Sequence, residues 1–228
     1  MTRRLGPLLV AVALGCSGLT ESEAGVVGIE VGVPGPDSVE VGESIQLTVK
    51  PINKDGDSAA VPVTWLSADP TATIDPSAGV LTGVSPGPAR VQASVGSLRS
   101  PIITFAVVAR ADSLVLAGDS ILTIPAGTTT SPGLLTRLDS FNPPGPIAGW
   151  RVVYAITSPD PAAAPPAVVF AGGTSADTVL TADDGTAAPT LTVAAPPPDT
   201  VIVQVRATHL RGAEVPGSGQ RFVVLFEH

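Results

Sequence analysis

Glycine and proline occur so often along this chain that long helices are disfavoured. The 228 residues include 24 Gly and 24 Pro, and each proline removes a backbone donor and obstructs a helix interior. Between these residues lie short runs rich in Val, Ile and Thr, which favour strands. In many of the runs apolar and polar side chains alternate, the period of a strand with one buried face. The sequence therefore predicts an all-β protein built from short strands.

The N-terminus has the layout of a secretory signal. Arg3 and Arg4 precede an almost wholly apolar run at residues 5–14, and small residues then lead to Cys16, the chain's single cysteine. The apolar run is shorter than the roughly 20 residues that a membrane-spanning helix needs, and a lone cysteine cannot form an internal disulfide. We expect residues 1–15 to be a cleaved segment that targets the chain without anchoring it.

Residues 13–16, Ala-Leu-Gly-Cys, resemble the lipobox of bacterial lipoproteins. The resemblance implies cleavage between Gly15 and Cys16, and a diacylglycerol on the Cys16 sulfur, usually with an N-acyl chain. Two or three acyl chains are sufficient for stable membrane attachment, whereas a single chain gives only marginal binding. The alternative is an ordinary signal peptide, cut near Ala24, that discards Cys16.

The residues after Cys16 bear on its location. In Gram-negative lipoproteins an aspartate at the next position often causes retention at the inner membrane, and Ser17 at this position favours the outer membrane. Residues 16–25 are mostly small, polar or acidic, and we expect the segment after Cys16 to be a flexible tether. Loss of Arg3 and Arg4 with the signal changes the net charge from -8 to -8 - 2 = -10. Such a surface repels nucleic acid, so we expect no nucleic-acid partner.

Residues 26–110 are predicted to form a first β-sandwich. Short alternating runs at residues 39–49, 61–65 and 90–95 are separated by turn residues, among them the Asn-Lys-Asp-Gly-Asp run at 53–57. Short strands at this spacing are typical of a sandwich. Trp65 lies in an alternating run and is predicted to be the core aromatic residue; the alternative is a surface residue that stacks on a ligand.

Residues 39–95 resemble a bacterial immunoglobulin-like (Ig-like) domain of group 2. The matching features are Val-Gly-Glu at 41–43, Val-Thr-Trp at 63–65 and Gly-Val-Leu-Thr-Gly at 79–83. The resemblance implies an Ig-like sandwich and cell-surface or adhesion roles. Antibody domains pair the core tryptophan with a disulfide, which this chain cannot form.

Residues 111–228 are predicted to form a second Ig-like sandwich. Short strand patterns recur there, and proline-rich segments, such as residues 142–146 and 196–198, are read as connections because proline cannot join an inner strand ladder. Residues 146–152 and 181–187, with residues 190–192, resemble another bacterial Ig-like type, nearest the invasin-like group 1. Residues 107–112 contain no Gly or Pro, which predicts a short, stiff connection between the domains.

Motifs for catalysis are missing from the sequence. His209 and His228 are the only histidines, and neither lies in a nucleophile-elbow, zinc-protease or phosphate-loop motif. We expect His209 to face solvent or end a strand rather than act in a catalytic triad. The acidic turns at 55–57 and 183–185 lack the spacing of a calcium loop and are read as hairpin turns. No enzyme activity, cofactor or metal is expected.

The sequence therefore predicts a non-enzymatic, lipid-anchored envelope protein, attached to the outer membrane through Cys16, whose tandem Ig-like domains serve adhesion, ligand binding or spacing. Its partner would be a protein or cell-surface ligand. The alternative is a periplasm-facing accessory subunit that docks onto a membrane complex or secreted enzyme. A less favoured alternative is an enzyme whose active site is formed by loops of the second domain.

Overall fold

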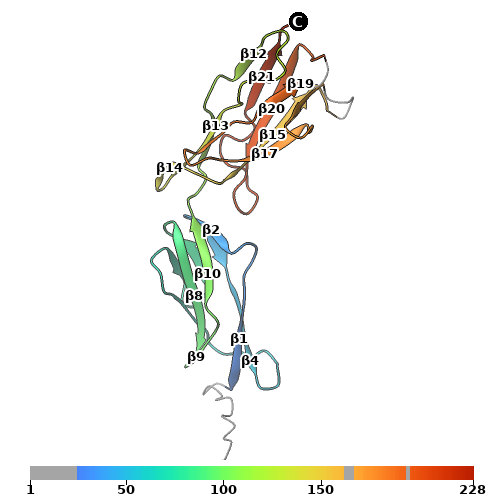
Figure 1. Cartoon of the computed structure of the whole chain (residues 1–228). Coiled ribbons are helices and arrows are strands. Elements are labelled where there is room, and N and C mark those ends of the chain that lie inside the picture. Colours follow the sequence, from blue (N-terminus) through green and yellow to red (C-terminus); the bar gives the residue numbers. More distant parts are fainter. Residues whose placement is uncertain (1–24, 162–166, 194–195) are drawn as a thin grey trace, which may run out of the picture.

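A computed structural model shows two β-sandwiches arranged end to end (Figure 1). The structure describes residues 25–161, 167–193 and 196–228, and all regular elements in these ranges are strands. The predicted all-β fold with tandem Ig-like sandwiches is confirmed. Of the residues described, none belongs to a helix with the length and apolar character to span a membrane.

Domain 1 follows the strand order of an Ig-like sandwich. One layer has the order β2-β10-β8-β5, and the other is formed by the pair β1-β4 and by β3-β7-β6. The strands are β1 (Val26–Gly32), β2 (Ser38–Glu40), β3 (Ser44–Gln46), β4 (Thr48–Asn53), β5 (Thr64–Ser67), β6 (Ala72–Ile74), β7 (Val80–Gly83), β8 (Gly87–Val95), β9 (Leu98–Arg99) and β10 (Ile103–Val108).

Trp65 lies at the centre of the domain 1 core. Its side chain is 2% exposed, and the buried residues around it include Leu81, Val91 and Phe105. Gly79 packs against the indole: a Cβ at this position would lie 2.6 Å from the ring nitrogen, and its φ of +71° is one that other residues rarely adopt. The glycine that opens the 79–83 motif therefore makes room for the core aromatic ring.

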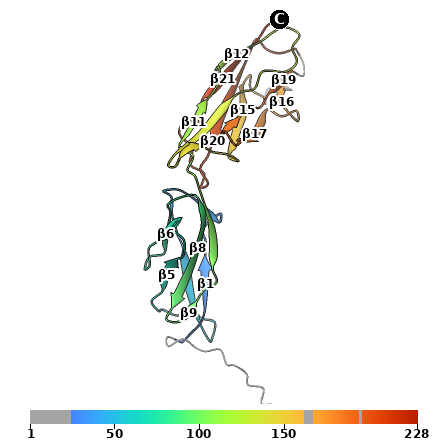
Figure 2. The same ribbon diagram turned by 60° about the vertical axis from the view of Figure 1, so that its left-hand side comes forward.

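Domain 2 has the same general plan with a larger second layer. Its five-stranded sheet has the order β12-β21-β20-β15-β17; the opposite layer contains β11-β13-β14, with β18 beside β13, and the pair β16-β19 (Figure 2). The strands are β11 (Ser113–Leu116), β12 (Ile121–Ile124), β13 (Thr136–Phe141), β14 (Pro144–Pro146), β15 (Arg151–Ser158), β16 (Val168–Phe170), β17 (Ala176–Leu180), β18 (Thr186–Ala187), β19 (Leu191–Val193), β20 (Thr200–Ala207) and β21 (Arg221–Phe226).

Both domains share one topological feature that supports a common fold type. An early strand pairs in parallel with the last strand of its domain, β2 with β10 and β12 with β21. All other strand pairs are antiparallel, as expected for sandwiches with Greek-key connections.

The structure corrects part of the strand prediction. The proline-rich run at 142–146 is predicted to be a connection, but its residues 144–146 form β14, which pairs with β13 at the edge of its sheet. The inward face of β13 carries Thr136 and Ser140 on either side of Leu138, all three buried. Because polar residues occupy buried positions in β13, its sequence lacks the alternation of apolar and polar residues that predicts a strand.

Candidate functional site

The two sandwiches meet at a short connection. β10 ends at Val108 and β11 begins at Ser113, so residues 109–112 join the domains. Both ends of this segment are tied to neighbouring strands: the Val41 amide donates to the Val108 carbonyl at 3.0 Å, and the Asp112 amide donates to the Asp139 carbonyl at 3.0 Å. Ala111 is fully buried. The connection is therefore short, as the sequence predicts, and backbone hydrogen bonds hold both of its ends.

A loop of domain 2 extends across this joint. It follows β20, is closed by a bridge between Thr208 and Glu214, and contains a tight turn in which the Gly212 amide donates to the His209 carbonyl at 3.0 Å. The Trp150 indole nitrogen donates to the Thr208 carbonyl at 3.0 Å and fastens the base of the loop to the sandwich. The loop therefore presents residues 209–211 to domain 1 in a defined conformation.

Glu40 of domain 1 receives this loop. It lies at the end of β2, and its side chain is 3% exposed. One carboxylate oxygen lies 2.7 Å from Nδ1 of His209, and the other accepts a hydrogen bond of 2.7 Å from the Leu210 amide. A buried carboxylate is tolerated only when its oxygens have partners, and both partners of Glu40 come from the other domain.

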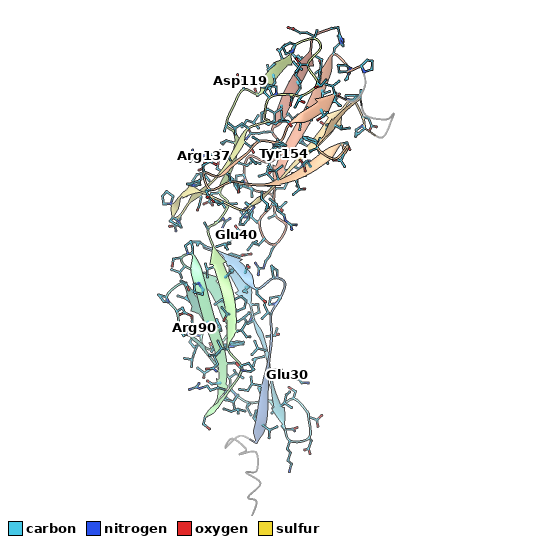
Figure 3. All side chains as sticks on the ribbon, in the orientation of Figure 1. Glu30, Glu40, Arg90, Asp119, Arg137 and Tyr154 are labelled. Carbon is cyan, nitrogen blue, oxygen red and sulfur yellow. The ribbon has the colours of Figure 1, made fainter. Side chains whose placement is uncertain are left out.

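An ion pair flanks this contact. Arg211 donates through Nη1 to Glu43 at 2.9 Å and through Nη2 to the Ser38 carbonyl at 3.2 Å. The same Glu43 oxygen accepts from the Glu40 amide at 2.9 Å. We call the set of Ser38, Glu40, Glu43, His209, Leu210 and Arg211 the interdomain clasp. Figure 3 shows Glu40 at the junction of the two domains.

The clasp favours one relative orientation of the domains. A different orientation that kept Glu40 buried would leave its carboxylate without His209 and Leu210, which is unfavourable. A mainly apolar groove of about 490 Å³ lies beside the clasp, lined by residues that include Val107, Ala109, Ile147 and Trp150. Side chains of both domains therefore contribute to one continuous surface at the joint.

A larger groove lies in domain 1, away from the joint. It has a volume of about 600 Å³ and runs between the β1-β4 pair and the start of β10, lined by residues that include Ile29, Val49, Pro101 and Ile103. Glu30 and Lys50 add charged groups to a mainly apolar lining.

The predicted site residues fall in three places. Gly15 and Cys16 lie outside the described residues. Trp65 is a core residue of domain 1 and is not available to stack on a ligand. His209, expected to face solvent or end a strand, lies two residues after the end of β20 and is largely covered in the clasp. Sequence reasoning missed Glu40 because its partner lies 169 residues away in the chain.

The two acidic turns have local structural roles. Asn53 Oδ1 accepts from the amides of Asp55 and Asp57 at 3.0 and 2.9 Å. Asp184 accepts from the amide and hydroxyl of Thr186, and these hydrogen bonds lower the pKa of Asp184. No cluster of three or more His, Cys, Asp or Glu side chains able to hold a metal is found in the described residues.

No protein-family model matches the sequence, and no curated protein matches it. Among solved structures, the chain is similar to the Yersinia pseudotuberculosis adhesin InvE (14% identity, 85% of this chain and 57% of that one, TM-score 0.38). It is also similar to the D00-D0 domain of intimin (16% identity, 88% and 100%, TM-score 0.34) and to fibronectin(III)-like modules of Clostridium thermocellum CbhA (15% identity, 87% and 94%, TM-score 0.38). These likenesses are too weak to carry an argument about function.

Proposed function

We propose that the protein is a non-enzymatic, lipid-anchored envelope protein whose tandem Ig-like domains hold a binding surface at a distance from the membrane. The interdomain clasp carries this proposal, because it gives two small domains one preferred orientation. A loose tether between domains would allow Glu40 to separate from His209 and Leu210.

The positions of β1 and the C-terminus at opposite ends of the two-domain structure support the same function. β1 begins at the end of domain 1 far from the joint, and the C-terminus lies at the far end of domain 2 (Figures 1 and 2). With a lipid on Cys16, domain 1 is the membrane-proximal unit and domain 2 the distal one. Loops and sheet faces of domain 2 are then the parts that a partner reaches first.

The finer parts of the proposal rest on sequence patterns. The lipid anchor rests on the Ala-Leu-Gly-Cys run at 13–16, location at the outer membrane on Ser17, and the group 2 Ig-like assignment of domain 1 on residues 39–95. The absence of catalytic motifs in the sequence favours a binding or spacing role over an enzyme.

Protease treatment of intact cells tests the proposal, with the wild type compared to a Cys16→Ser variant. We expect wild-type protein to stay in the membrane fraction and to be cut on whole cells, and the serine variant to leave the membrane. Cleavage only after the outer membrane is opened would favour a periplasm-facing accessory subunit. Unchanged membrane binding of Cys16→Ser would contradict the lipid anchor.

A further inference from the structure

The arginines of domain 2 differ in their partners. Three of them form ion pairs: Arg137 with Asp139, Arg206 with Glu214 and Arg211 with Glu43 at the joint. In the described parts of the chain, Arg151 and Arg221 form no ion pair. Although acids are in excess in a chain of net charge -8, these two guanidinium groups are therefore not neutralised by an ion pair within the chain.

Arg151, Arg206 and Arg221 lie on the outer face of the five-stranded sheet. All three are exposed, and their neighbours in sequence are buried in the domain 2 core: Val152 after Arg151, Val205 and Ala207 around Arg206, and Phe222 after Arg221. Because successive side chains of a strand point to opposite faces, the three arginines project from the face opposite the core.

The strand register places these arginines on one diagonal across β15, β20 and β21. Val153 is opposite Arg206 in the β15-β20 pair, so Arg151 is a diagonal neighbour of Arg206. Gln204 is opposite Arg221 in the β20-β21 pair, so Arg206 is a diagonal neighbour of Arg221. Diagonal neighbours lie about 7–8 Å apart. The next position on the same diagonal is Ile121 of β12, opposite Val223 and 60% exposed.

This row matches the geometry of an extended peptide. Alternate residues of a strand point to the same side and lie about 6.6–6.8 Å apart, close to the diagonal spacing of the arginines. Each guanidinium presents a planar fork of donors that fits a carboxylate. An aliphatic side chain at the following alternate position would contact Ile121. We propose that this arginine diagonal binds an extended acidic segment of a partner protein that carries carboxylates on alternate residues.

The contacts of Arg206 are compatible with this role. Arg206 donates to Glu214 at 2.8 Å, but both side chains are more than half exposed, and exposed ion pairs contribute little stability. Arg206 also donates through Nε to the Gln204 side chain at 3.2 Å, which helps to fix the guanidinium over the sheet. A partner carboxylate can therefore replace Glu214 at low cost. The acidic remainder of the protein repels the same segment and limits binding elsewhere.

The test measures binding of two labelled peptides to the purified full-length protein by fluorescence polarisation at low and physiological salt. The first peptide is Glu-Thr-Glu-Thr-Glu-Thr-Val, and the second has the same composition with its three glutamates adjacent. We expect the alternating peptide to bind more tightly, and the double variant Arg151→Gln/Arg221→Gln to weaken this binding about tenfold and reduce its salt dependence.

The matched control is the double variant Arg99→Gln/Arg137→Gln, which removes the same charge elsewhere on the surface. We expect it to bind the alternating peptide like the wild type. Thermal melting checks that both variants are folded. Equal weakening by the two double variants, equal binding of the two peptides, or no peptide binding would overturn the proposal. Binding of polygalacturonate through Arg151 and Arg221, without peptide binding, would also overturn it and indicate an acidic polysaccharide.

Discussion

The two sandwiches share a topology but stabilise their cores differently. In domain 1 the central side chain, Trp65, packs among apolar groups and against Gly79. In domain 2 the central side chain is Tyr154, which lies in the upper sandwich in Figure 3. Its hydroxyl forms a hydrogen bond with the Thr136 hydroxyl and donates another to the Ala187 carbonyl at 3.0 Å. The central side chain of domain 1 therefore packs through an indole that does not titrate, whereas that of domain 2 carries a buried, titratable hydroxyl, so the two domains should respond differently to mutation and pH.

The largest expected difference comes from removing a core aromatic residue from one domain at a time. Trp65→Ala should destabilise domain 1 by about 3–5 kcal/mol, because a large buried side chain leaves a cavity. Phe222→Ala should do the same to domain 2, since Phe222 is fully buried there. Calorimetry should show one transition shifted in each variant and the other retained. Equal shifts of both transitions in each variant would contradict two separate cores.

The next effect concerns alkaline pH and domain 2 alone. Burial raises the pKa of Tyr154 to about 12, whereas an unfolded tyrosine titrates near 10. The phenol therefore ionises first in the unfolded chain, and domain 2 should lose roughly 3 kcal/mol of stability as the pH rises from about 10 to 12. Domain 1 contains no tyrosine, because Tyr154 is the only one in the chain.

Tyr154→Phe isolates this contribution. At neutral pH it should cost about 1–2 kcal/mol through lost hydrogen bonds, while Thr136 keeps its contact of 3.3 Å with the Ala187 carbonyl. Denaturant unfolding at several pH values should show a weaker alkaline loss for the variant than for the wild type. If the wild type and the variant lose the same stability at alkaline pH, groups other than Tyr154 are responsible for the loss.

The smallest effect concerns acid pH and domain 1. Hydrogen bonds from the Ala78 and Ser77 amides and from the Ser77 hydroxyl lower the pKa of Asp75. The stabilisation of domain 1 by ionised Asp75 is therefore fully present above the ordinary carboxyl pKa, near 4. It is lost as the pH falls through the lower pKa that Asp75 has in the folded domain. Asp75→Asn should lower the domain 1 melting temperature by a few degrees at pH 7 and have less effect near pH 2. A constant difference at both pH values would contradict this explanation.

Domain 1 was easier to predict from the sequence for a physical reason. Two of its signals are local in the sequence. The alternating residues around Trp65 correspond to a strand in which Trp65 is buried, and the Asn-Lys-Asp-Gly-Asp run at 53–57 forms a turn. In domain 2 the buried hydroxyls of Thr136 and Ser140 interrupt the apolar pattern of β13. The partners of the Thr136 hydroxyl, Tyr154 and the Ala187 carbonyl, lie 18 and 51 residues along the chain, so no local pattern marks Thr136 as inward-facing.

The candidate site was less predictable than the fold. A short, stiff connection could be inferred from residues 107–112, but the clasp depends on Glu40 meeting a loop that begins more than 160 residues later. The arginine diagonal likewise requires the register of β15, β20 and β21. Pairings between distant segments are set by tertiary structure, and a single sequence contains no direct signal for them.

The central claim is that the clasp holds the two domains in one orientation. It can be tested by electron spin resonance distance measurement between labels at Lys54→Cys in domain 1 and Asp119→Cys in domain 2, in a Cys16→Ser background that removes the only native cysteine. Glu40→Ala removes the acceptor of His209 and Leu210. Glu30→Ala is the matched control, because Glu30 lies on β1, away from the joint (Figure 3).

We predict a narrow distance distribution for the parent protein and for Glu30→Ala, and a broad one for Glu40→Ala with both domains still folded. A broad distribution in the parent protein, or a narrow one that Glu40→Ala leaves unchanged, would contradict the account.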